Sequence, residues 1–160
     1  LGFDESAAEA AMTQVRWPAR MQRLRAGPLV EAAGKAELWL DGGHNASAGA
    51  ALGKHLGDLP TRPTYLICGM LNTKDVRGYL APLASHVDRL TAVSIPGEAA
   101  TLDASETAEA ARDVGMVADE AANVRTALDR IVGEAPEARV LICGSLYLAG
   151  EVLRENVQPD

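Results

Sequence analysis

The chain has 160 residues, of which 48% are hydrophobic, which suits one well-buried core and is too little for two ordinary domains. Twenty-two acidic side chains against 15 basic ones give a net charge of −7, which argues against binding to nucleic acid or anionic membranes. No apolar run approaches the roughly 20 residues that span a bilayer, and the start lacks a basic signal-peptide region. We therefore expect one soluble, cytoplasmic domain over residues 1–160.

The first elements predict a helix followed by two neighbouring strands. Residues 5–15 are rich in helix formers, and Pro18 ends that helix because the residue before a proline avoids the helical region. Residues 21–24 combine apolar and polar side chains, as a short edge strand does, and Gly27-Pro28 is expected to turn the chain toward a buried strand at residues 37–41. This pair predicts one antiparallel edge strand near the N-terminus. The chain lacks an initiator Met and opens inside the first helix, so we expect it to be a fragment.

From residue 46 onward, helices and strands alternate. The expected helices are 46–56, 76–85, 104–114, 121–132 and 147–155, and the expected strands are 64–69, 89–95, 115–118 and 140–143. Alternation at this spacing indicates right-handed βα units with helices on both faces of the sheet. The fold class is therefore predicted to be α/β, a Rossmann-like three-layer sandwich with a mostly parallel sheet.

Glycine and polar residues follow three of the predicted strands. Ligands of such sheets bind outside the carboxyl ends of the strands, where helix N-termini point unpaired N–H groups, and glycine lets the backbone approach a ligand closely. The side chains expected to project into one site there are Asp41, His44, Asn45, Lys74 and Ser145. The strands ending at Asp41, Cys68 and Cys143 should then lie together in the middle of the sheet.

Each of these residues also has a purely structural interpretation. Asp41, Asn45 and Ser145 could cap the helices that follow them, since Asp, Asn and Ser are preferred at that position. Lys74 could be a solvated loop lysine, and His44 could satisfy a turn. The joint pattern at three strand ends, rather than any single member, favours a site.

Several familiar motifs are absent. Gly53-Lys54 lacks the first glycine of a phosphate-binding P-loop, and Gly42-Gly43 does not continue into a dinucleotide-binding fingerprint. The histidines and cysteines have no metal-ligand spacing, so no metal site is predicted. Both cysteines occur in the tetrapeptide Leu-Ile-Cys-Gly, which is typical of buried strand residues rather than of a disulfide.

Four segments, in order, carry a family resemblance. Trp17–Gln22 is similar to W-P-G-R-[LM]-[EQ], Leu40–Asn45 to L-D-G-A-H-N, Gly69–Asp75 to G-x-x-x-D-K-D, and Gly144–Val152 to G-S-L-[YF]-L-x-G-x-V. These motifs resemble the C-terminal domain of folylpolyglutamate synthases and bifunctional dihydrofolate synthases, within the Mur ligase superfamily. The departures are Ala19, Gly43, Ala46 and Thr73, the last replacing an aspartate beside Lys74.

The resemblance implies an ATP-dependent ligase that adds L-glutamate to folate or dihydropteroate through an acyl phosphate. The phosphate loop and the Mg²⁺ ligands would lie in an N-terminal ATPase domain, with residues 1–16 at the junction, so this chain alone is expected to be inactive. By matching position, Arg20 would reach the ATP phosphates and Asp41 the ribose hydroxyls, with Asn45 shaping the loop or touching the nucleotide.

For the incoming glutamate, the resemblance implies that His44 and Ser145 hold the substrate and that Lys74 pairs with one of its carboxylates. Catalytic roles would fall to Arg20, His44 and Ser145, with Arg20 at the rim facing the ATPase domain. A Mur-type peptidoglycan ligase is a close variant of this hypothesis. A Rossmann-like binding or regulatory domain without ligase activity is the alternative from another class, and a P-loop encoded upstream would distinguish the two.

Overall fold

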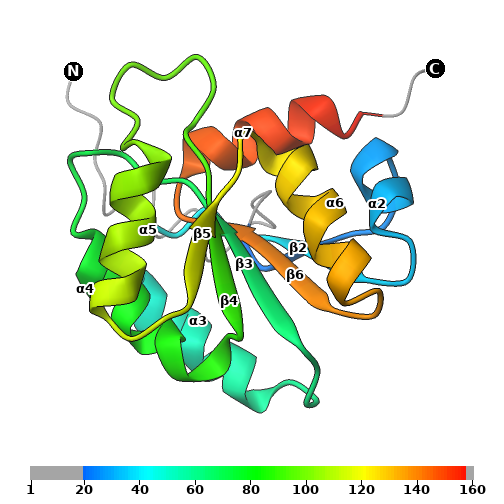
Figure 1. Cartoon of the computed structure of the whole chain (residues 1–160), viewed down its shortest axis with the longest axis horizontal. Helices are drawn as coiled ribbons and strands as arrows, with labels where there is room; N and C mark the ends of the chain where they lie inside the picture. Colours follow the sequence, from blue (N-terminus) through cyan, green and yellow to red (C-terminus); the bar gives the residue numbers. More distant parts are fainter. Residues whose placement is uncertain (1–19, 158–160) are drawn as a thin grey trace.

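The structure, a computed structural model, describes residues 20–157 and contains a six-stranded sheet (Figure 1). The strands are β1 (Gln22–Leu24), β2 (Glu37–Leu40), β3 (Thr64–Cys68), β4 (Arg89–Ala92), β5 (Ala118–Glu120) and β6 (Arg139–Cys143). The helices are α2 (Pro28–Ala33), α3 (Ala46–Asp58), α4 (Val76–Leu80), the 3₁₀ helix η1 (Ala81–His86), α5 (Ala104–Asp113), α6 (Val124–Glu134) and α7 (Leu146–Glu155).

The sheet order is β1-β2-β6-β3-β4-β5. Strand β1 pairs antiparallel with β2 at one edge, and the other pairs are all parallel. The predicted fold class and its antiparallel edge strand are therefore confirmed. Because β6 lies between β2 and β3, the strands that end at Asp41, Cys68 and Cys143 are neighbours, as expected.

Side chains of the sheet point alternately into two cores. On β6, which is buried along its length, Val140 and Ile142 pack in one apolar cluster with α2, α6 and α7, whereas Leu141 and Cys143 pack in a second with α3, α4, η1 and α5. Figure 1 shows these two sets of helices on opposite faces of the sheet. The cysteines are both free and buried, which confirms their prediction as core strand residues.

One helix is not predicted by the sequence patterns. Gly27-Pro28 predicts a turn directly toward the next strand, but Pro28 begins α2 instead. Proline is well tolerated at the first helical position, because its missing N–H would have no intrahelical partner there and its fixed φ suits a helix. Leu29 and Ala33 lie on the buried side of this helix, which packs against α6 and β2.

Other boundaries differ from the predicted ones for local reasons. The helix expected over 76–85 is divided into α4 and η1, because Pro82 lacks the N–H that an uninterrupted α-helix would need. The strand expected over 115–118 lies at 118–120, after a turn in which Gly115 adopts φ +93°. Helix α6 starts at Val124 rather than residue 121, because Asn123 caps it by accepting from the Thr126 N–H.

The helix predicted over residues 5–15 and most of the first motif, Trp17 to Ala19, lie outside the described residues. Within residues 20–157, no helix is both long and apolar enough to cross a membrane.

Candidate functional site

The carboxyl ends of β2, β6 and β3 stop at the same level. Leu40 is paired with Ile142, and Cys68 with Cys143. Beyond the strands, the Asp41 N–H donates to the Ile142 carbonyl at 2.9 Å and the Gly69 N–H to the Cys143 carbonyl at 3.2 Å. The three glycine-containing turns therefore leave the sheet side by side, as the sequence predicted.

Asp41 is 9% exposed and is held by main-chain donors. Its Oδ1 accepts from the Gly43 N–H at 2.8 Å, and its Oδ2 accepts from the Met21 N–H at 3.0 Å. Met21 has φ +40°, in the left-handed region that a residue with a side chain rarely occupies. Asp41 thus fastens the turn that carries Arg20, an exposed cation, to the end of β2.

Burial raises the pKa of Asp41 above its ordinary value of 3.8. The hydrogen bonds from Gly43 and Met21 and the positive charges of Arg20 and His55 oppose this rise without cancelling it. Asp41 is thus a buried carboxyl that is satisfied mainly by backbone amides, although each oxygen has a further lone pair that could accept from a ligand.

His44 is half-buried, and its Nδ1 lies 3.2 Å from the Gly42 carbonyl. A carbonyl can only accept, so this hydrogen bond requires the proton on Nδ1 and makes Nε2 the acceptor in the neutral ring. The next residue, Asn45, is exposed and caps α3, with its Oδ1 accepting from the Ala48 N–H at 2.8 Å. The capping interpretation of Asn45 is therefore correct for this structure.

Ser145 is 2% exposed and caps α7, with its Oγ accepting from the Tyr147 N–H at 3.0 Å. Its hydroxyl can still donate. The preceding Gly144 has φ +108°, and a Cβ there would lie 2.7 Å from the Gly69 carbonyl oxygen and 2.9 Å from Cys68 Sγ. Only glycine fits this turn, so the backbone brings Ser145 and the first turn of α7 directly against the end of β3.

Lys74 lies beyond β3, in a turn where its N–H donates to the Leu71 carbonyl at 3.3 Å. It lines a small recess of about 310 Å³ together with Glu106 and Glu109 of α5, and is half-buried. Asp75, the next residue, caps α4. The structure thus brings the turns of Asp41, His44 and Ser145 together at the ends of β2 and β6, and sets Lys74 toward α4 and α5.

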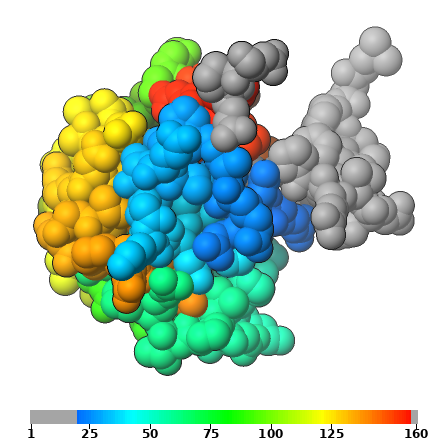
Figure 2. Space-filling model, turned by 90° about the vertical axis from the view of Figure 1, so that its right-hand side faces the viewer, coloured from blue at the N-terminus to red at the C-terminus, as the bar shows by residue number. Residues whose placement is uncertain are grey.

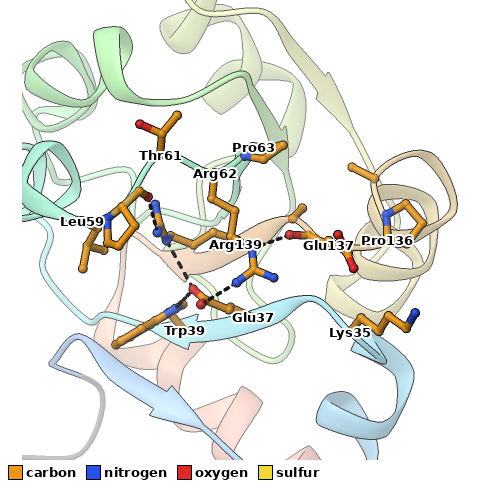
Figure 3. A pocket seen from close by; sticks show the side chains of 13 residues that line it. Lys35, Glu37, Trp39, Leu59, Thr61, Arg62, Pro63, Pro136, Glu137 and Arg139 are labelled. Atoms are coloured by element: carbon orange, nitrogen blue, oxygen red, sulfur yellow. Dashed lines mark hydrogen bonds and ion pairs between the residues drawn. The ribbon is translucent and has the colours of Figure 1, made fainter.

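A charged cluster at the opposite end of the sheet is not predicted by any sequence motif. There Glu37, Arg62 and Arg139 lie at the wall of a recess of about 840 Å³ (Figure 3). Glu37 and Arg139 are 102 residues apart in the chain, so no motif spacing could connect them. The only local signal is that a charged residue opens each of two otherwise apolar strands.

Comparison with known proteins places this architecture in a family. The family model for the C-terminal domain of dihydrofolate synthetase matches residues 29–155. The chain belongs to this family. Among the curated relatives, the folylpolyglutamate synthase of Lacticaseibacillus casei is 29% identical over 136 residues, which cover 85% of the chain and 29% of that protein.

Solved folylpolyglutamate synthases have the same fold. The Mycobacterium tuberculosis enzyme complexed with ADP superposes with a TM-score of 0.73 at 26% identity, covering 99% of this chain and 36% of that one. E. coli FolC in complex with ADP, without folate substrate, gives 0.71 at 26% identity, covering 96% and 35%. The chain therefore spans about a third of the length of these proteins.

Proposed function

We propose that this chain is the C-terminal domain of an ATP-dependent ligase that adds L-glutamate to folate or dihydropteroate. The observation that carries the proposal is the family match over residues 29–155. Relatives solved with ADP support nucleotide use. A Yersinia pestis enzyme of the same fold, 22% identical with a TM-score of 0.68, was solved with Mn, AMPPNP and L-glutamate bound.

The proposed chemistry overcomes the poor reactivity of a carboxylate at neutral pH. The γ-phosphoryl group of ATP moves to the carboxylate oxygen and ADP is released. The amine of glutamate attacks the acyl phosphate, loses a proton, and the tetrahedral intermediate expels phosphate. In this proposal an N-terminal ATPase domain binds the triphosphate and Mg²⁺, and the chain closes over the nucleotide. Within residues 20–157 no group of three or more His, Cys, Asp or Glu side chains could hold a metal ion.

For the nucleotide, we assign Arg20 to the phosphates and Asp41 to the ribose hydroxyls. A guanidinium group can donate two parallel hydrogen bonds to phosphate oxygens and stabilise the charge on a transferring phosphoryl group. The bond from Met21 to Asp41 supports these roles, because it ties the Arg20 turn to the edge where α3 and α7 begin. Asn45, already bonded to the helix, would contribute loop shape or a nucleotide contact.

For the incoming glutamate, we assign His44 and Ser145 as binding and catalytic side chains and Lys74 as the partner of one carboxylate. The Nε2 of His44 takes no part in the hydrogen bond to the Gly42 carbonyl, so it is available to a ligand. Ser145 caps α7 through its oxygen and can still donate its hydroxyl proton. Lys74 would have to leave the acidic side chains of its own recess to meet a substrate carboxylate.

A chimera tests the proposal directly. The C-terminal third of the L. casei folylpolyglutamate synthase would be replaced by this chain, and ATP-dependent incorporation of labelled glutamate measured with folate and with dihydropteroate. The chimera should turn over at least one of them, and the isolated chain neither. Turnover by the pure isolated chain would contradict the division of labour, and a folded, ADP-binding chimera without turnover would contradict the assigned activity.

A further inference from the structure

A second recess lies at the amino ends of β2, β6 and β3, at the opposite end of the sheet from the candidate site. It has a volume of about 840 Å³ and is formed by three segments distant in sequence, residues 35–39, 59–63 and 135–139. These segments come together at the molecular surface in the space-filling view (Figure 2). Its size lies within the range of about 300–1,000 Å³ typical of small-molecule sites.

The wall of this recess carries an excess of positive charge. One carboxylate, Glu37, is shared by three guanidinium groups, those of Arg62 at 2.6 Å, Arg139 at 3.4 Å and Arg23 at 3.7 Å. The other charged residues that line the recess are Lys35 and Glu137. Among the lining residues, three cations face two carboxylates, so one positive charge remains uncompensated in a chain whose net charge is −7, which favours an anionic ligand.

The arginines differ in what their donors already do. Arg139 is buried, and each of its three side-chain nitrogens already donates within the fold, to Glu37, Thr64 and the Pro60 carbonyl. Arg62 donates from Nε to the Glu137 carbonyl and from Nη1 to Glu37 (Figure 3). Its Nη2 donates to no other residue in the described part of the chain, which leaves the two N–H groups of that nitrogen as charge-assisted donors for a ligand.

The walls next to Arg62 are apolar and rigid. Trp39 lines the recess, and its ring is fixed by the Nε1 hydrogen bond to Glu37 at 3.1 Å and by Arg23, whose guanidinium lies 5.5 Å from the ring centroid. Pro60, Pro63 and Pro136 complete the wall. Prolines have no backbone N–H and a fixed φ, so they offer a preformed surface without competing donors.

We propose that this recess binds a small organic carboxylate with an apolar body. The carboxylate accepts from Arg62 Nη2, and the body packs against Trp39 and the prolines. A purely inorganic anion would leave the apolar wall unused, and a neutral apolar molecule would leave the excess charge uncompensated. This inference is independent of the proposed ligase function, because it uses none of the residues at the carboxyl ends of the strands.

Benzoate is a suitable probe, with benzamide as its neutral isostere and inorganic phosphate as an anion without an apolar body. The readout is the Trp39 indole N–H resonance of the ¹⁵N-labelled 160-residue chain, assigned with Trp39→Phe. Benzoate should shift it saturably, with half-saturation at a concentration about tenfold or more below that of benzamide, because a charge-assisted hydrogen bond is lost in the amide. Phosphate should produce no saturable shift.

Arg62→Gln should raise the benzoate half-saturation concentration about tenfold, and Arg62→Lys should have a smaller effect because it keeps the charge. The matched control is Arg77→Gln, in an exposed ion pair with Asp113 on α5, which should leave benzoate binding unchanged. Resonances away from the recess report whether each variant is folded. Equal affinity for benzoate and benzamide in the unsubstituted chain, no saturable benzoate shift, or unchanged binding in folded Arg62→Gln would each overturn the proposal.

Discussion

Two carboxylates at opposite ends of β2 are held by different kinds of partner. Asp41, at the carboxyl end, accepts from two backbone N–H groups, and burial raises its pKa. Glu37 begins the same strand. Its partial burial acts to raise the pKa, but the hydrogen bond from Trp39 and the charges of Arg62, Arg23 and Arg139 outweigh this and lower it. One end of the sheet is thus organised by backbone amides and the other by guanidinium groups.

The kind of partner limits what each end of the sheet can offer a ligand. At the carboxyl end, glycine turns and helix caps shape the backbone, and the polar side chains of Asp41, Asn45 and Ser145 already have main-chain partners there. A ligand at this end would bind to the remaining lone pairs of these oxygens, to the Ser145 hydroxyl proton and to exposed cations such as Arg20. At the amino end, Arg62 retains a charged donor beside an apolar wall.

The largest expected effect lies at the carboxyl end, where the backbone geometry is least tolerant. Gly144→Ala should destabilise the chain by on the order of 4 kcal/mol, because left-handed backbone strain adds to overpacking against the Gly69 carbonyl and Cys68. Gly133→Ala is the matched control. Gly133 lies near the end of α6, where a Cβ would meet no atom within 4 Å, and alanine there should be neutral or stabilising by up to about 1 kcal/mol. Urea unfolding would compare the two, and equal effects would contradict this explanation of the turn.

The second effect lies at the amino end. Arg139→Ala should cost about 2 kcal/mol, because it removes the packing of a buried side chain and its hydrogen bonds to Glu37, Thr64 and the Pro60 carbonyl. Glu37 would keep Arg62 and Arg23 as partners. The same substitution at Arg77, whose side chain is 59% exposed, should change the free energy of unfolding little. A loss at Arg139 no larger than at Arg77 would show that the cluster does not hold the strand starts together.

The smallest expected effect is on the pH dependence of the free energy of unfolding. The pKa of Glu37 is lowered and that of Asp41 is raised, so the two groups should change this dependence in opposite directions. Glu37 stabilises the fold above its ordinary pKa of 4.5, and this contribution is lost as pH falls through its lowered pKa. For Asp41 the folded state favours the protonated form, so its contribution decreases as pH rises from 3.8 through the raised pKa. Unfolding free energies of Glu37→Gln and Asp41→Asn, measured across this acidic range, should differ from the unsubstituted chain with slopes of opposite sign. Slopes of the same sign would contradict the comparison.

The same contrast explains what could be predicted from the sequence. In the turns after β2, β3 and β6, glycine and polar residues directly follow an apolar strand, so each turn can be recognised from the local sequence. Because the three strands are parallel neighbours, their turns then lie side by side. The sheet, its antiparallel edge and the buried cysteines were therefore predictable. Helix α2 was not, because Gly27-Pro28 is equally typical of a turn and of a helix start.

The amino-end recess was not predictable for a different reason. Glu37, Arg62 and Arg139 meet only because β6, the last strand in the chain, inserts between β2 and β3. The main-chain partners of Asp41 were also not predictable, because its bond to Met21 depends on a turn with an unusual φ. The expectation that His44 and Ser145 share one ligand remains a prediction.

The most direct test of the proposed function is the glutamate KM of the chimera with His44→Ala and, separately, Ser145→Ala. If these side chains hold the incoming glutamate, KM should rise about tenfold or more, the consequence of losing a hydrogen bond to a charged group, while the melting temperature of His44→Ala changes little. Arg62→Gln in the same chimera should leave the glutamate KM unchanged, because it lies at the other end of the sheet. An unchanged KM in both the His44 and Ser145 variants would mean that these residues serve only as turn and cap, and would contradict the assignment of the glutamate site.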